Sequence, residues 1–165
     1  MKTIVIAEAG VNHNGSIKLA KELIDVAKDA GADFVKFQTF KAETLVTKTV
    51  DKAEYQKKLT GKGETHFSMI KKLELSEEDH VHLLDYSLKK GIKFLSTGFD
   101  IDSIDLLMKL NIPIIKIPSG EITNLPLLRH IGNKRKPVIL STGMSTIKEI
   151  IDATNVLTNN GLKKE

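Results

Sequence analysis

The chain has 165 residues, with 25 Lys and Arg against 21 Asp and Glu, which gives a formal net charge of +4. Its 41% hydrophobic and 28% charged residues are typical of a folded domain and exclude a wholly disordered chain. No apolar stretch approaches the roughly 20 residues of a membrane span, and the absence of Cys excludes disulfides and cysteine nucleophiles. Glu8 comes too early for a secretory signal. We therefore expect one cytoplasmic domain with a sizeable core and no membrane partner.

The basic net charge does not indicate a nucleic-acid partner. Lysines alternate with acids along the chain, and the one compact basic run is Lys134-Arg135-Lys136. The chain has no Trp and only 5% aromatic residues, so few rings are available to stack on bases. We predict that most of these charges lie on solvated helix faces.

Short apolar segments alternate with amphipathic ones along the chain. Predicted strands, which are apolar and rich in β-branched residues, lie at residues 3–7, 34–39, 93–97, 114–117 and 137–141. The predicted helices run from the cap Ser16 to Gly31, from Ser76 to Lys90, over residues 101–110, and from Ile147 to near Gly161. A long polar excursion separates the second strand from the helix at Ser76, where Ser-Glu-Glu-Asp resembles a capping box.

Strand–helix units in series indicate an α/β fold with a parallel sheet and right-handed crossovers. Two architectures fit this order: an open doubly wound sheet, or a (β/α)8 barrel of the TIM type. Five units can be counted, whereas a full barrel takes around 250 residues. If the fold is a barrel, only about the first five units are present.

Polar residues gather where the predicted strands end. Lys36 and Gln38 are two residues apart and therefore project to the same side of the second strand. The carboxyl ends of parallel strands meet at one edge of a sheet, so we expect these polar side chains to lie together. The others are Glu8 after the first strand, Ser96 and Thr97 in the third, Lys116, Ser119 and Glu121 in or after the fourth, and Ser141 and Thr142 after the fifth.

Two lysines inside apolar strands indicate an anionic ligand. A buried lysine costs several kcal/mol unless an anion compensates its charge, and Lys36 and Lys116 lie on different strands. Hydroxyl groups beside glycines, as in Ser119-Gly120 and Thr142-Gly143, suit phosphate or carboxylate oxygens. We therefore predict a site for a small anion at this edge of the sheet.

Structural alternatives to this site remain open. Each lysine could close an ion pair with Glu8 or Glu121, which could otherwise transfer protons. The Ser-Gly and Thr-Gly sequences could serve only to turn the chain. The sequence leaves these alternatives undecided.

The histidines form no predicted metal site. His13 is expected to bond the backbone of its own loop, with contact to a ligand as the alternative. His80 and His82 are two residues apart on one helix and point to different faces, so they do not make a metal pair. Surface positions are expected for His66, His80, His82 and His130.

Five motifs resemble the sialic acid synthase family. They are residues 6–15 (IAEAGVNHNG), 35–39 (VKFQT), 94–97 (FLST), 116–121 (KIPSGE) and 139–144 (ILSTGM). Their order and spacing agree with the family over essentially the whole chain. The resemblance implies a (β/α)8 barrel that condenses phosphoenolpyruvate with an N-acylated amino sugar, giving a nine-carbon 2-keto acid and phosphate. It also implies a divalent metal, Mn²⁺ or Mg²⁺, as cofactor.

The resemblance also implies roles for individual residues. Contacts to phosphoenolpyruvate are implied for Lys36, Thr97, Lys116, Ser119 and Ser141. Glu8 and Gln38 resemble residues near the aldehyde and the sugar, and Glu121 resembles a proton-transfer group. The candidate catalytic residues are thus Glu8, Lys36, Lys116 and Glu121. The excursion around Tyr55 and Gln56 is expected to help cover the sugar.

Two departures from the family bear on these expectations. Gly98 stands where the family usually has Pro, which is expected to loosen the turn that presents Thr97. The family's metal-binding histidines and its C-terminal antifreeze-like domain come from later sequence. The chain therefore resembles the N-terminal part of a synthase, and we expect it to be inactive alone and to oligomerise or pair with a complementary fragment.

Two other functions remain open from the sequence. A Schiff-base aldolase would use Lys36 or Lys116 as its nucleophile. A non-catalytic module would bind a phosphorylated ligand without turnover.

Overall fold

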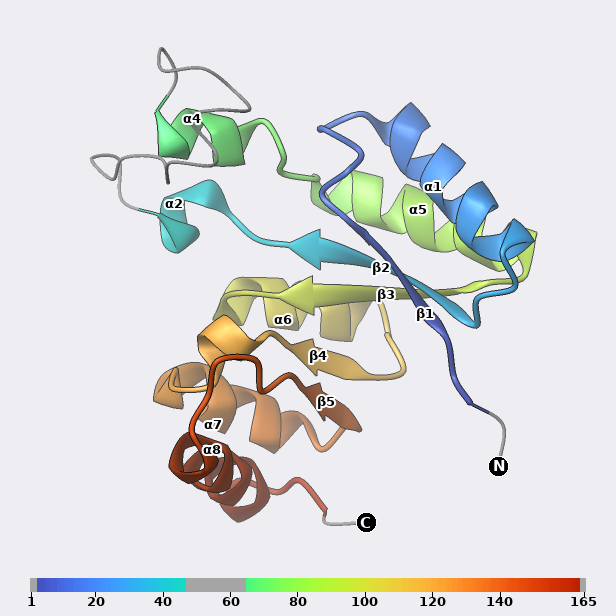
Figure 1. Ribbon diagram of the computed structural model, residues 1–165. Coiled ribbons are helices and arrows are strands. Elements are labelled where there is room, and N and C mark those ends of the chain that lie inside the picture. Colours follow the sequence, from blue (N-terminus) through green and yellow to red (C-terminus); the bar gives the residue numbers. More distant parts are fainter. Residues whose placement is uncertain (1–2, 47–64, 164–165) are drawn as a thin grey trace.

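Five parallel strands form one sheet in the computed structural model, which describes residues 3–46 and 65–163 (Figure 1). The strands are β1 (Ile6–Gly10), β2 (Phe34–Thr39), β3 (Lys93–Gly98), β4 (Ile115–Ile117) and β5 (Val138–Leu140). Their order in the sheet is β1-β2-β3-β4-β5, the same as in the sequence. A doubly wound sheet reverses its strand order at a switch point, and this sheet does not. The fold is therefore a partial barrel of the TIM type with five strands, as one of the two alternatives predicted.

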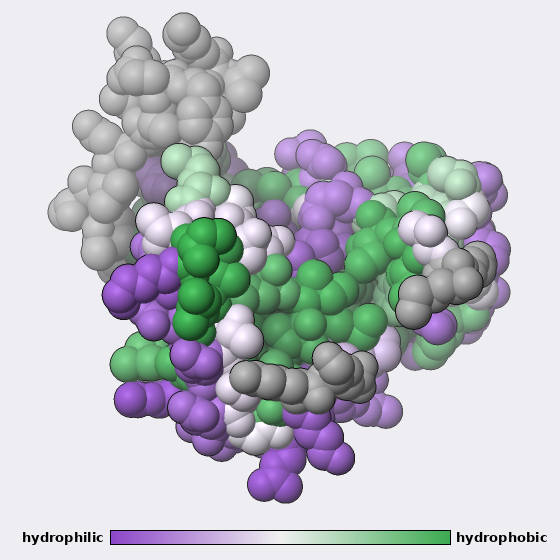
Figure 2. Space-filling model, turned by 60° about the horizontal axis from the view of Figure 1, so that its bottom comes forward, coloured by the Kyte–Doolittle hydropathy of each residue, from purple (hydrophilic) through white to green (hydrophobic). Residues whose placement is uncertain are grey.

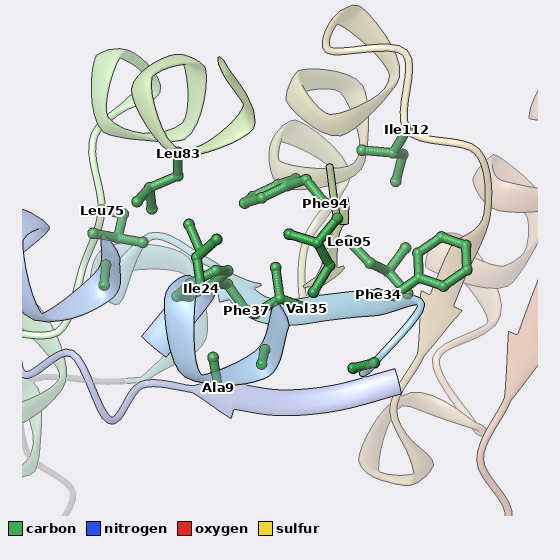
Figure 3. Close-up of a cluster of buried hydrophobic side chains, with 14 of the residues drawn as sticks. Ala9, Ile24, Phe34, Val35, Phe37, Leu75, Leu83, Phe94, Leu95 and Ile112 are labelled. Carbon is green, nitrogen blue, oxygen red and sulfur yellow. The ribbon is translucent and has the colours of Figure 1, made fainter. Parts of the chain in front are cut away.

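Helices follow the strands, and the longer ones pack against the outer face of the sheet. They are α1 (Ile17–Asp29), α2 (Ala42–Leu45), α4 (His66–Lys71), α5 (Glu77–Lys90), α6 (Ile101–Lys109), α7 (Leu125–Lys134) and α8 (Ile147–Asn159), with a 3₁₀ turn, η1 (Ser119–Glu121). Figure 3 shows Ile24 of α1 and Leu83 of α5 beside Val35 and Phe37 of β2, and all four are fully buried. A second cluster joins β4 to α7 and α8. Because alternate strand residues face this outer layer, the residues between them face inwards.

Local sequence accounts for the ends of α5. The Ser76 hydroxyl accepts from the Asp79 N–H, and the Asp79 carboxylate accepts from the Ser76 N–H, so the predicted capping box is present. Gly91 ends the helix with φ +69°, which a glycine adopts without strain.

The predicted strands are confirmed, with shifted ends at β1. This strand runs to Gly10 because the pairing with β2 changes register between Glu8 and Gly10, where Gly10 takes φ +55°. Helix α7 was not predicted, although Asn124 caps it and Pro126 lies in its first turn.

Helices α2 and α4 lie at the two ends of the polar excursion, and Glu74 joins them. Its carboxylate contacts the Lys71 amine at 2.7 Å and the Lys41 amine at 3.6 Å, and it accepts from the Ala42 N–H at 3.3 Å. The ends of the excursion are therefore held side by side. Tyr55 and Gln56, which were expected to cover a sugar, lie outside the described residues.

Gly15 allows the loop after β1 to approach α4. Its φ is +77°, and a Cβ atom at this position would lie 2.3 Å from the Lys72 carbonyl oxygen. We expect Gly15→Ala to lower the free energy of unfolding by about 2–4 kcal/mol, because the clash adds to the left-handed strain. Gly31→Ala is the matched control, since Gly31 has φ +78° and no described atom within 4 Å of that Cβ. It should lose only about 1–2 kcal/mol in urea unfolding, and equal losses in the two variants would contradict the clash.

Hydrophobic side chains are exposed at both edges of the sheet. Ile4 and Val5 precede β1, and Ile147 and Ile151 on α8 are 73% and 54% exposed. Figure 2 shows hydrophobic residues gathered across the middle of one face. Among the described helices, none has the length and apolar character needed to cross a membrane.

Candidate active site

Strand register brings five of the predicted polar residues into one layer, whereas Ser96 faces the opposite side with Thr39. Glu8 pairs with Lys36 between β1 and β2, and Gln38 pairs with Thr97 between β2 and β3. Thr97 pairs in turn with Lys116 of β4. Register partners in a sheet point to the same face, and Val35 and Phe37 occupy the opposite one. These five polar side chains therefore line the inner face of the sheet near its carboxyl edge.

Lys36 is buried and already has an anionic partner. Its side chain is 10% exposed, and its Nζ forms an ion pair with Oε2 of Glu8. The same amine donates a hydrogen bond to Oγ1 of Thr97 at 3.0 Å. The ion-pair alternative is therefore present at Lys36. The Glu8 side chain remains 54% exposed, so the pair is open to the inner face.

Lys116 is a cation without such a partner. Its Nζ donates to Oγ of Ser141 at 2.7 Å and to the Ile117 carbonyl oxygen at 2.8 Å. Within residues 3–46 and 65–163, no carboxylate forms an ion pair with it. Burial lowers the pKa of Lys116, the nearby charge of Lys36 lowers it further, and Glu8 opposes the shift. An anion beside Lys116 would compensate this charge.

Glycines keep the space around these side chains open. A Cβ atom on Gly10 would lie 3.3 Å from Oε1 of Glu8 and 3.7 Å from Nε2 of Gln38, so these two side chains flank one point on the loop. A Cβ atom on Gly143 would lie 3.6 Å from Oγ of Ser119, which brings the loops after β4 and β5 together. A larger residue at either glycine would contact these side chains, and at Gly10, where φ is +55°, it would also strain the backbone.

Glu121 does not pair with a lysine in the described structure. Its Oε2 accepts a hydrogen bond from Nδ2 of Asn124 at 2.7 Å, so the predicted alternative of an ion pair with Lys36 or Lys116 is wrong for this residue. Asn124 also accepts from the Leu127 N–H as the cap of α7. Sequence reasoning missed Asn124, although an Asn two residues before Pro126 is a typical helix start.

Gly98 is the buried last residue of β3, and a Cβ atom there would lie 2.8 Å from Cδ1 of Ile104. The side chain of Ile104 in α6 thus uses the space that a larger residue would take. Thr97 next to it is 2% exposed, pairs with Gln38 in register and bonds to Lys36.

The histidines differ from expectation in part. His13 is buried, and its Nδ1 accepts from the Gly15 N–H at 3.0 Å, which confirms the predicted bond within its own loop. His80 was expected at the surface, and this prediction is wrong, because α5 turns it onto the sheet with no exposed area. His130 is half-buried against Asp105 at 2.8 Å, and only His82 is clearly exposed.

No three His, Asp or Glu side chains converge on one point within the described ranges. These residues therefore do not fit the divalent metal that the resemblance implies.

Comparison with known proteins identifies the family. The model of the NeuB family matches residues 23–164. The chain belongs to the NeuB family. The predicted resemblance to sialic acid synthases is thereby confirmed, and so is the barrel class, because solved structures of this family superpose on the chain.

Several named relatives of this NeuB-family chain are sugar-acid synthases. It is 57% identical over 91% of its length to N,N'-diacetyllegionaminic acid synthase of Legionella pneumophila and 53% identical over 99% to that of Campylobacter jejuni. The N-acetylneuraminic acid synthetase of Leptospira borgpetersenii superposes with a TM-score of 0.79 at 31% identity, covering 96% of this chain and 51% of that one. The chain spans 42% and 49% of the two curated relatives, less than half of each.

Proposed function

We propose that this NeuB-family chain is the N-terminal part of a cytoplasmic enzyme that condenses phosphoenolpyruvate with an N-acylated amino sugar. The products are a nine-carbon 2-keto acid and phosphate. The observation that carries the proposal is the amine of Lys116, which forms no ion pair with any described carboxylate and lies two strands from Lys36 on the same inner face. The names of the relatives support an amino-sugar partner.

The anionic substrate binds between the two lysines. Phosphoenolpyruvate carries a phosphate and a carboxylate on three carbons, so it offers charge to Lys36 and Lys116 together. Hydroxyl groups of Thr97, Ser119 and Ser141 add hydrogen-bond donors around the ligand. Hydrogen bonds to its charged oxygens are stronger than bonds between neutral groups. Because burial weakens competition from water, these contacts are stronger than they would be on an open surface.

Condensation then follows from the groups around that anion. C3 of phosphoenolpyruvate forms a bond to the aldehyde carbon of the open-chain sugar, whose oxygen takes a proton. Water adds at C2, and cleavage of the C–O bond releases phosphate and leaves the 2-keto group. The lysine charges stabilise the departing phosphate. Glu8 and Gln38 orient the aldehyde, and Glu121 transfers a proton at the tetrahedral intermediate.

A divalent metal of the kind that the resemblance implies would supply a Lewis acid for a carbonyl oxygen when bound. Since the described residues do not fit a metal site, its ligands are assigned to sequence outside them, and the roles above belong to side chains of this chain alone.

Calorimetry with three ligands tests the site. Phosphoenolpyruvate is expected to bind at least tenfold more tightly than inorganic phosphate or pyruvate, because only phosphoenolpyruvate engages both lysines. With N-acetylmannosamine and Mn²⁺ added, the chain alone is expected to release no phosphate. Equal affinity for the three ligands would overturn the proposed binding site. Phosphate release at the rate of a full-length synthase would overturn the expectation that this chain is inactive alone.

The exposed edges of the sheet support the further proposal that the chain associates with other barrel units or with a second copy. Ile4 and Val5 beside β1, and Ile147 and Ile151 on α8, would be covered by the remaining barrel units or by a second copy. We expect the chain to oligomerise in light scattering at high concentration. A clean monomer would contradict this.

A Schiff-base aldolase is the second candidate, and the lowered pKa of Lys116 favours it, because a neutral amine is the nucleophile. Borohydride reduction with pyruvate distinguishes the two. A covalent adduct on Lys116 would support the aldolase, and its absence supports condensation without a lysine adduct.

A further inference from the structure

A chain of three buried polar side chains crosses from the sheet to α5. Ser96 Oγ lies 2.7 Å from Thr39 Oγ1, and Thr39 Oγ1 lies 2.7 Å from His80 Nε2. The exposed fractions of Ser96, Thr39 and His80 are 0%, 4% and 0%. We call these three residues the buried polar chain. It joins β3, β2 and α5 behind the inner face.

The direction of its hydrogen bonds follows from its last acceptor. Nδ1 of His80 lies 2.7 Å from the Ser76 carbonyl oxygen, which can only accept, so Nδ1 carries a proton. In a neutral imidazole Nε2 is then an acceptor, and it accepts a hydrogen bond from the Thr39 hydroxyl. Thr39 in turn accepts from Ser96. Burial lowers the pKa of His80, which keeps the ring neutral.

The buried polar chain lies directly behind two proposed ligand contacts. Thr39 follows Gln38 in β2, and Ser96 precedes Thr97 in β3. Successive strand residues face opposite sides, so the buried polar chain holds the outer side of the two strands whose inner side presents Gln38 and Thr97. A shift of either strand end would move both presented side chains.

We infer that the buried polar chain positions Gln38 and Thr97 for the anionic substrate and its aldehyde partner. The inference rests on the proposed function. It makes Thr39, Ser96 and His80 positioning residues, since none of them faces the ligand. It also predicts that acid weakens ligand binding, because a protonated Nε2 can no longer accept from Thr39.

Several charged groups act on His80 from the elements around it. Asp79 and Glu77 of α5 favour its protonated form. Lys41 at the start of α2 opposes that form, and His80 and His13 in the loop after β1 oppose each other's protonation. Burial is the largest influence, so neutral His80 prevails near pH 7.

Substitutions that remove single links test the inference by calorimetry with phosphoenolpyruvate at pH 7.5. Ser96→Ala removes one buried hydrogen bond and is expected to weaken binding roughly fivefold to tenfold. Thr39→Val removes both bonds and is expected to weaken binding at least as much. Ser87→Ala is the matched control, because Ser87 is a fully buried serine of α5 whose hydroxyl has no partner in the described structure. It should bind within twofold of the unaltered chain.

A pH series separates positioning from simple packing. Between pH 7.5 and 5.5, His80→Gln should retain affinity better than the unaltered chain, because glutamine keeps an acceptor near Nε2 and does not titrate there. Ionisation of the ligand's phosphate is common to both and cancels in the comparison. Parallel pH profiles, or unchanged affinity in Ser96→Ala, would overturn the inference.

Hydrogen exchange at the Gln38 and Thr97 amides gives a readout that needs no ligand. Exchange is expected to be at least tenfold faster in Ser96→Ala than in Ser87→Ala at the same pH. If the unaltered chain binds no phosphoenolpyruvate, the proposed function fails, and equal exchange rates in the two variants would overturn the inference separately.

Discussion

Replacing Lys116 with methionine is expected to weaken phosphoenolpyruvate binding about 100-fold, or roughly 3 kcal/mol, because a charged donor in a half-buried site is lost. The stability of the Lys116→Met variant should not fall along with its affinity. Lys116 is a desolvated cation without a carboxylate partner in the described structure, so its removal relieves a cost. We expect the free energy of unfolding to stay level or rise by about 1 kcal/mol. Calorimetry and urea unfolding on the same variant measure both effects.

Lys136→Met is the matched control for this substitution. Lys136 also donates two hydrogen bonds, to Oδ1 of Asn111 at 2.9 Å and to the Ile112 carbonyl oxygen at 3.0 Å, but it precedes β5 at the opposite edge of the sheet. Its replacement should leave the affinity for phosphoenolpyruvate within twofold. Equal losses of affinity in the two variants would show that the lysine on the inner face has no special role.

Acidification is expected to destabilise the fold through two buried histidines. Burial lowers the pKa of His80 and of His13 below the ordinary value of 6.5, and their mutual repulsion adds to the shift of His13. Between the folded pKa and about pH 6.5, each ring is neutral in the folded protein and takes up a proton on unfolding. The stability they contribute is fully present above about pH 6.5 and is lost as the pH falls towards the folded pKa. Each contributes a slope of up to about 1.4 kcal/mol per pH unit.

Urea unfolding at pH 7.5, 6.0 and 5.0 measures this slope. His80→Gln should reduce the histidine contribution without abolishing it, because His13 remains. His82→Gln, on the exposed side of the same helix, serves as the control and should keep the full slope. A free energy of unfolding that is constant over this range would contradict the role of the buried rings.

The parts of the fold that local chemistry determines were predictable from sequence. Helix α5 begins at the Ser76 capping box and ends at Gly91, as the residues indicated. Strand β2 occupies residues 34–39 as predicted, because its apolar run is bounded on both sides. Both cases depend on residues close together in the chain. The sequential strand order then distinguished the barrel from the doubly wound sheet, which the pattern of strands and helices in the sequence could not do.

Features that depend on distant partners were harder to predict. His80 was predicted to lie at the surface because it falls in a polar, helical stretch. It instead shares the buried stripe of α5 with Leu83 and Ser87, at helical spacing. That spacing was the available signal. Its partner Thr39 comes from another element, so the hydrogen bond could not be predicted from either residue alone.

The sequence indicated which residues gather at the candidate site but not which of them pair with one another. Lys36 and Lys116 were singled out as buried cations, and the structure places them on one inner face. Their environments differ, because Glu8 pairs with Lys36 only, whereas Lys116 bonds to hydroxyl and carbonyl oxygens. Strand register decides this difference, and register is set by the whole sheet.

A crystal structure of the chain grown with phosphoenolpyruvate tests the central claim most directly. We predict ligand oxygens about 2.7–2.9 Å from the amines of both Lys36 and Lys116, the distance typical of charge-assisted hydrogen bonds. The result that would contradict the account is a ligand bound elsewhere, for example in the 310 Å³ cavity lined by Arg135, Lys136 and Lys163, with the inner face of the sheet left free.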